Sequence, residues 1–193
     1  MTIAWYVRLR DRPRTSGEPS PRPFAAWPTD TFFGDDKELF FNDEAIQLIY
    51  QPGHTDGDVL VFFRRSDVVA SGDLFQTTTY PVIDVARGGT IQGEIAALNT
   101  LSELAVSSVP IVTREEGTLI VSGHGRVYDQ LDVVEYRDMV TIVRDRIKDM
   151  VQRGLTLAQV KAARPTLDFD GRYGSTTGAW TTSMFIEAVY KTL

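Results

Sequence analysis

Three short, continuous apolar runs, at 58–63, 68–71 and 118–122, constrain the fold of this 193-residue chain more than any other feature. Apolar runs of this length, bounded by turn residues, are typical of strands that are covered on both faces in layered α/β proteins. Each run stands next to glycines and next to a residue that can bind a metal. His54 precedes the first run, Asp73 follows the second and His124 follows the third.

The segments between and after these runs predict one mixed α/β (α+β) domain. Alternating apolar residues over 38–50, interrupted by a turn at Asn42-Asp43, predict a β-hairpin. Apolar residues at helical spacing predict helices over 91–105 and 132–151.

The N-terminal part of the chain is expected to be irregular, and the C-terminal part is expected to be helical. Proline-rich residues 1–30 are interpreted as an irregular connector, which leaves 31–193 as the domain. Near the C-terminus, Thr156 and Gln159 form the capping-box pattern of a short helix, and Thr181 or Thr182 is expected to begin the last helix.

Composition excludes several classes of function. The net charge of −6 argues against nucleic acid or an anionic membrane as a partner, and no apolar run is long enough to span a bilayer. The absence of cysteine excludes disulfides and a thiolate nucleophile. No signal peptide is recognisable, so the chain as written is expected to be soluble and cytoplasmic, and export of a longer form stays open.

The positions of His54, Asp73 and His124 predict a shared site. Loops at one edge of an α/β sheet converge on a common crevice, and zinc accepts both imidazole and carboxylate ligands. A single histidine is more often an ordinary surface or core residue than a ligand. Three such residues at matching strand ends make metal binding and a structural role about equally plausible.

The motifs Gly53-His54-Thr55-Asp56-Gly57-Asp58, Ser71-Gly72-Asp73-Leu74-Phe75 and Ser122-Gly123-His124-Gly125 resemble, in order, the later metal motifs of the metallo-β-lactamase superfamily. The stretch from Trp27 to Leu193 is similar to the C-terminal portion of its hydrolases. The resemblance implies half of a four-layer αββα sandwich and a site for two zinc ions. In that site His54 would bind the first zinc, Asp73 would bridge both as the residue at the catalytic centre, and His124 would bind the second.

Further expectations follow from the same resemblance. Asp56 and Asp58 are candidates to orient His54 through its second ring nitrogen. The alternative, that either is simply a turn-forming residue before a strand, carries about twice the weight. The substrate would be a small molecule with an ester, lactone, thioester or amide bond. Tyr80 and Tyr128 are expected to serve packing rather than substrate contact.

One departure from the family pattern matters. The family's first signature, His-x-His-x-Asp-His, is absent, and the chain has only two histidines. Three hypotheses stay open: a truncated zinc hydrolase that is weak or inactive alone, a non-catalytic interaction module, and a residual site that binds one metal through all three residues. Loss of the other half would also uncover an apolar sheet face, through which the chain is expected to form a homodimer or contact a partner that carries the missing half.

Overall fold

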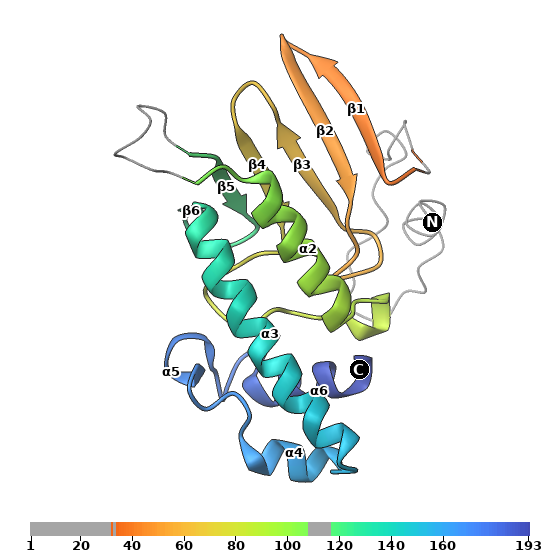
Figure 1. Cartoon of the computed structure of the whole chain (residues 1–193), viewed down its shortest axis with the longest axis vertical. Coiled ribbons are helices and arrows are strands. Elements are labelled where there is room, and N and C mark those ends of the chain that lie inside the picture. The colour runs from red at the N-terminus through yellow and green to blue at the C-terminus, as the bar shows by residue number, and fades with distance from the viewer. Residues whose placement is uncertain (1–31, 33, 108–116) are drawn as a thin grey trace.

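The computed structural model describes residues 32, 34–107 and 117–193, which form a six-stranded sheet with helices packed against it (Figure 1). The strands lie in chain order and are β1 (Asp36–Phe41), β2 (Glu44–Tyr50), β3 (Val59–Phe63), β4 (Val68–Gly72), β5 (Leu119–Ser122) and β6 (Val127–Tyr128). The pair β4–β5 is parallel, and the other four neighbouring pairs are antiparallel. The mixed α/β prediction is confirmed. The connector at 1–30 lies outside the described residues.

The helical elements are η2 (Val85–Arg87), α2 (Ile91–Leu104), α3 (Gln130–Gln152), α4 (Leu157–Ala163), α5 (Asp170–Tyr173) and α6 (Thr182–Thr192). Helices α2 and α3 lie side by side against one face of the sheet, and α4 and α6 pack around the C-terminal part of α3 (Figure 1). Helix α5 lies beside the N-terminal half of α3, where Arg172 pairs with Glu135 and Tyr173 packs on Tyr136. The expected helices are confirmed, and Thr181 rather than Thr182 caps the last one. No helix in the described ranges is long and apolar enough to cross a membrane.

The predicted hairpin is confirmed by β1 and β2, and the backbone conformation of Asn42 and Asp43 explains why the chain turns at these residues. Asn42 and Asp43 have φ angles of 51° and 60°. Two successive residues with positive φ suit the tight turn that matches the twist of paired strands, and Asn and Asp tolerate this conformation better than most residues.

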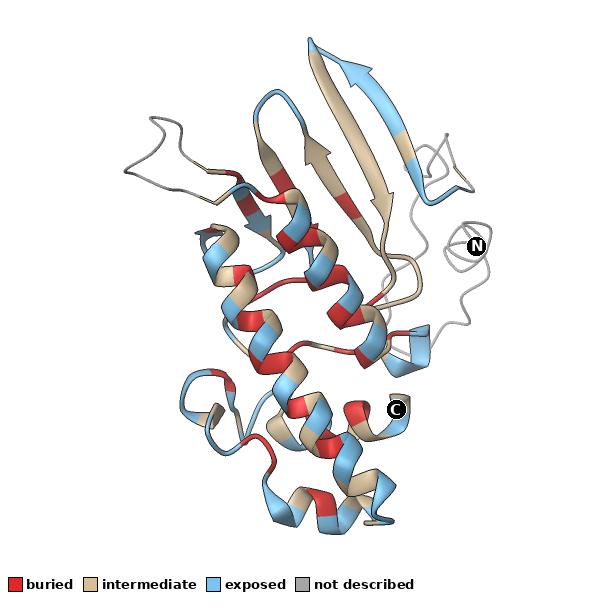
Figure 2. Cartoon of the chain, viewed as in Figure 1, coloured by how far each residue is buried: buried red, intermediate tan, exposed pale blue. Residues whose placement is uncertain are grey.

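Only one face of the sheet is fully covered, so the expectation that its strands are buried on both faces holds for one side alone. Leu60, Val69 and Ile120 face the helices and are completely buried. On the other face Val121 is 42% exposed and Phe41 is 68% exposed. Strand β1 is exposed over most of its length (Figure 2). The cause is that α2 and α3 both pack on the same side.

An aromatic cluster fixes the segment that follows β4. Phe75 packs edge-on against Tyr136 of α3, and Tyr80 stacks on Phe185 of α6 with ring centroids 4.7 Å apart. Tyr128, 3% exposed, packs against Phe75 as well. Packing was the expected role of both Tyr80 and Tyr128, and their burial matches it. This cluster holds the chain between Asp73 and residue 84 in place beside the strand ends.

Candidate metal centre

His54 lies in a loop between β2 and β3 that Asp58 closes from within. The two oxygens of Asp58 accept hydrogen bonds from Gly53 N at 3.2 Å, from Thr55 N at 2.6 Å and from Thr55 Oγ1 at 2.8 Å. A carboxylate that accepts three hydrogen bonds from residues of one short loop restricts the conformation of that loop. The contacts of Asp58 therefore match the turn-forming interpretation.

Two glycines let neighbouring backbone approach this loop closely. A Cβ atom on Gly89 would lie 2.1 Å from His54 O, and one on Gly93, at the start of α2, would lie 2.4 Å from Pro52 O. Any side chain at either position would push the loop away. Asp84 N also donates a hydrogen bond to His54 O at 2.9 Å. The backbone of His54 is thus held between the segment after β4 and the first turn of α2.

Asp73 and His124 meet because β4 and β5 are parallel neighbours that end at the same edge of the sheet. Gly72 has a φ of +55°, which lets the chain turn sharply at the end of β4. Gly123 N donates to Gly72 O at 2.7 Å and ties the two strand ends together. A Cβ on Gly123 would lie 2.3 Å from Asp73 Oδ1, so the carboxylate occupies the space that this glycine leaves.

The structure brings all three predicted metal-binding residues together. His54 Nε2 lies 3.8 Å from Asp73 Oδ2, and His124 Nε2 lies 3.4 Å from Asp73 Oδ1. The side chain of His54 is 17% exposed, whereas that of His124 is 67% exposed. The group therefore has a buried end and an open end.

The contact made by the other ring nitrogen of His54 indicates which tautomer the neutral ring adopts. His54 Nδ1 is 2.5 Å from Val82 O. Because a carbonyl oxygen only accepts hydrogen bonds, we assign the proton of the neutral ring to Nδ1. Nε2 then carries only a lone pair and faces a carboxylate oxygen, which is also an acceptor. A cation between these two acceptors would satisfy both.

The spacing of these atoms fits metal ligands better than hydrogen-bond partners. Two ligands about 2.0–2.2 Å from a tetrahedral zinc lie roughly 3.3–3.6 Å apart, and the two nitrogen–oxygen distances of 3.4 and 3.8 Å are near this value. Each imidazole faces a different oxygen of Asp73, so the donors form two pairs. His54, Asp73 and His124 therefore do not surround a single point. In the described part of the chain no group of three or more His, Cys, Asp or Glu is placed to hold one ion.

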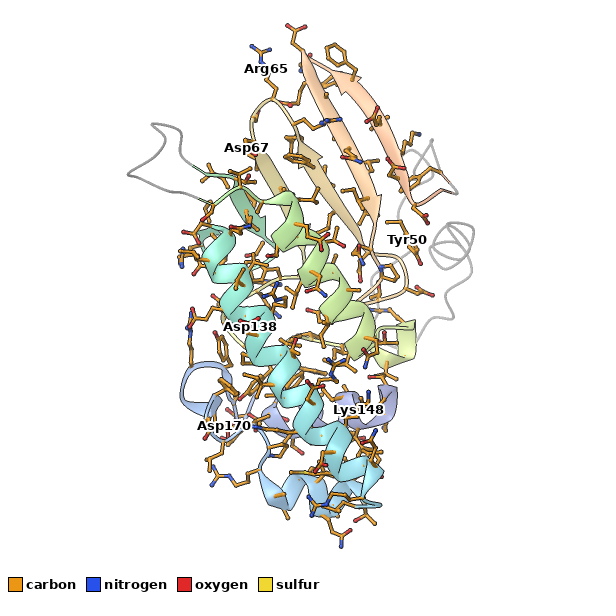
Figure 3. The ribbon with its side chains drawn as sticks, viewed as in Figure 1. Tyr50, Arg65, Asp67, Asp138, Lys148 and Asp170 are labelled. Atoms are coloured by element: carbon orange, nitrogen blue, oxygen red, sulfur yellow. The ribbon has the colours of Figure 1, made fainter. Side chains whose placement is uncertain are left out.

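The described contacts of Asp56 involve its backbone. Asp56 N donates to Arg87 O at 3.0 Å, and Asp56 O accepts from Tyr50 OH at 2.8 Å. Tyr50 stands beside this loop at the end of β2 (Figure 3). These bonds hold the backbone of Asp56 within the loop.

Glu94 is the residue near this group that sequence reasoning missed. It lies on α2, is 1% exposed, and neither carboxylate oxygen has a hydrogen-bond partner among the described residues. Burial raises the pKa of Glu94 well above its usual range, and the nearby charges of Asp58 and Asp73 raise it further. A signal was present, because Glu94 follows Ile91 by three positions and precedes Leu98 by four, which places it on the buried stripe of the helix.

Replacing Glu94 with glutamine is expected to stabilise the metal-free protein as the pH rises. The folded pKa lies above the ordinary value of 4.5, so the wild type keeps its full stability below that value and loses stability as the pH rises toward the folded pKa. At about pH 8 the variant should gain about 1–3 kcal/mol in the free energy of unfolding, and at about pH 4 almost nothing.

Urea unfolding in the presence of a chelator measures this difference. Glu103→Gln, at an exposed position of the same helix, is the matched control and should leave the pH dependence unchanged. If Glu94→Gln and the wild type lose stability in parallel between these pH values, Glu94 is not the source of the effect.

Comparison with known proteins adds family information to this geometry. A family model described as "Metallo-beta-lactamase superfamily" matches residues 2–124. The probable metallo-hydrolase YqgX of Bacillus subtilis (strain 168) is 31% identical over 107 residues, which are 55% of this chain and 46% of that protein. The chain thus spans about half the length of this curated relative.

The fold of this chain resembles that of a solved alkylsulfatase. The stereoselective inverting sec-alkylsulfatase Pisa1 from Pseudomonas sp. matches 85% of this chain and 26% of its own, at 13% identity and a TM-score of 0.59. BLEG-1 B3 metallo-β-lactamase matches 60% of this chain and 51% of its own, at 24% identity and a TM-score of 0.47.

Proposed function

Because the chain belongs to the metallo-β-lactamase superfamily, we propose that it supplies part of a zinc-dependent hydrolytic site. The observation that carries this proposal is the arrangement of Asp73, whose two oxygens each face the Nε2 atom of a different histidine. A carboxylate between two imidazoles suits a ligand shared by two metal ions. His54 and His124 would each complete one of the pairs.

The residues of this chain have distinct tasks in such a site. Val82 O keeps the proton of His54 on Nδ1, so that Nε2 is free to bind a metal. Asp73 supplies negative charge between the two positions, and the exposed side of His124 leaves room for a small-molecule substrate. Zinc bound here would supply Lewis acidity and an activated water near neutral pH.

The donor set limits what the chain does by itself. A catalytic zinc normally has three protein ligands and one open position. The described residues offer one imidazole and one carboxylate oxygen to each ion. We therefore propose that zinc binds weakly to this chain and that the chain alone hydrolyses ester, lactone, thioester and amide substrates poorly or not at all.

Zinc titration calorimetry tests the ligand assignment. Complete structural zinc sites bind with apparent free energies of about 10–16 kcal/mol, and the wild-type chain should bind less strongly than that. The His54→Ala, His124→Ala double variant should release no heat of binding beyond the heat of dilution. Equal binding by both proteins would refute the assignment. Hydrolysis that a chelator abolishes and zinc restores would instead refute the proposed inactivity.

Gly123→Ala tests whether Asp73 needs the space beside it. The new Cβ would lie 2.3 Å from Asp73 Oδ1 and displace the carboxylate from between the histidines. Zinc affinity is expected to fall by about tenfold or more. Gly171→Ala is the control, since a Cβ there meets nothing within 4 Å. Unchanged zinc affinity in Gly123→Ala would mean that Asp73 is not a ligand in the position described.

A second candidate function, a non-catalytic interaction module, is favoured by one observation: no group of three donors that could hold a metal lies within the described ranges. The two candidates differ in the zinc titration. A module that has lost its site would bind zinc no better than the double histidine variant. The hydrolase proposal requires a difference between them.

We further propose that the uncovered sheet face contacts a second protein layer that carries the remaining ligands. Apolar side chains on this face are exposed at both of its margins: Leu39 and Phe41 on β1, and Leu119, Val121 and Val127 on β5 and β6. Exposed apolar side chains spread over one face favour association, because burial removes them from water. A second copy of the chain is the alternative occupant.

Without that layer, the purified chain is expected to self-associate in sedimentation experiments. Replacing Val121 and Val127 together with lysine should shift the chain toward monomer, because lysine keeps its charge in water. Leu131→Lys is the control, since Leu131 is 63% exposed but lies on α3. A wild-type chain that is monomeric throughout the accessible concentration range would contradict the proposal.

A further inference from the structure

A cleft of about 680 Å³ lies among the C-terminal helices, and it shares no residue with the His54–Asp73–His124 group. Its walls come from the end of α4, the segment between α4 and α6, and the first turn of α6. Most of the lining is polar: the side chains that the argument uses are Lys161, Arg164, Thr166, Asp170, Thr181 and Ser183. Its volume is within the range of about 300–1,000 Å³ that is usual for small organic ligands.

Thr166 gives the first sign that this cleft binds something. It lines the cleft, it is 1% exposed, and its hydroxyl has no hydrogen-bond partner among the described residues. Its carbonyl oxygen, by contrast, accepts a hydrogen bond from Tyr80 OH at 3.1 Å. A buried hydroxyl without a partner costs stability unless a ligand supplies one.

The start of α6 gives a second sign. Thr182 N donates to Ser175 O, and Met184 N donates to Thr181 Oγ1. Ser183 N, between them, has no acceptor among the described residues. Free amides at the start of an eleven-residue helix attract anions through both hydrogen bonds and the helix dipole.

The charged side chains of the cleft are arranged to leave one cation accessible. Lys161 Nζ lies 2.8 Å from Glu187 Oε2 and is engaged there; Lys161 and Lys191 together lower the pKa of Glu187 to about 2. The Arg164 guanidinium is 62% exposed, and its Nη2 atom lies 3.8 Å from Asp170 Oδ2, beyond hydrogen-bond length. Arg164 therefore keeps donors available for a ligand.

Asp170 explains why the ligand should carry hydroxyl groups. Tyr80 OH donates to Asp170 Oδ1 at 3.0 Å, which fixes the carboxylate at the cleft wall. Asp170 is an acceptor that would repel an anion placed directly on it. A neutral hydroxyl of the ligand can donate to Asp170 while its anionic group lies toward Arg164.

We propose that this cleft binds a small phosphorylated metabolite with a hydroxylated body. Its phosphate would be held by Arg164, the Thr166 hydroxyl and the free amide at the start of α6. Guanidinium groups, hydroxyls and helix amides are the donors that proteins use for phosphate oxygens. The cleft is much larger than inorganic phosphate, so the remainder would hold the hydroxylated part. This inference does not depend on the proposed metal centre.

Calorimetric titration of the whole chain with glycerol 3-phosphate tests the proposal, with a chelator present so that no metal captures the phosphate. Arg164→Gln should weaken binding by about tenfold or more, and Thr166→Val by about threefold to tenfold. Lys148→Gln, which removes a charge from α3 away from the cleft lining, should bind like the wild type (Figure 3). Inorganic phosphate should bind more weakly than glycerol 3-phosphate, and citrate more weakly still.

Thermal unfolding of Thr166→Val without ligand separates a binding role from a structural one. Valine keeps the shape but removes the unpartnered hydroxyl, so the variant should be at least as stable as the wild type while its ligand binding falls. A clear loss of stability would show that the hydroxyl is structural and overturn its role. The proposal as a whole is overturned if glycerol 3-phosphate binds no protein, or binds Arg164→Gln as well as wild type. Tighter binding of citrate would overturn the assignment to phosphate.

Discussion

The parallel pairing of β4 with β5 is the interaction on which both the sheet and the candidate metal centre depend. Parallel neighbours cannot be joined by a short turn, so the chain must leave the sheet after Gly72 and cross over its surface before it returns at Leu119. The crossover contains α2, which buries one face of the sheet. Because both strands run in the same direction, Asp73 and His124 emerge at one edge, and the bond from Gly123 N to Gly72 O holds them in register.

Acidic side chains and imidazoles gather at this edge of the sheet. Asp73 stands between two imidazoles, and Asp58 closes the adjacent loop. The charges of these two aspartates raise the pKa of the buried carboxyl of Glu94. Val82 O fixes the one histidine that is mostly buried in the form that offers a lone pair. Asp73 and the two imidazoles thus place several lone pairs at one edge of the sheet, which is the environment that a divalent cation requires.

Sequence patterns revealed the elements of the fold because period and turn chemistry are local. The Asn42-Asp43 turn and the helix cap at Thr156 are examples, since each depends on residues that are neighbours in the chain. The position of His54, Asp73 and His124 beside strand ends made them candidates for metal binding, and the resemblance of their motifs to the family's later metal motifs gave the assignment. The contact between His54 and Val82 O was not, since any residue has a carbonyl oxygen. The Thr166 hydroxyl was equally hidden, because its lack of a partner emerges only when distant segments pack.

Segment 80–84 belongs to no strand or helix, yet its backbone is hydrogen-bonded both to the C-terminal helices and to the loop between β2 and β3. Tyr80 N donates to Tyr173 O among the C-terminal helices, and Asp84 N donates to His54 O in the loop between β2 and β3. Amide protons at these two positions are therefore protected by partners far apart in the chain. Opening of this segment would detach the C-terminal helices and the His54 loop together, so hydrogen exchange in the two regions would proceed as one cooperative unit.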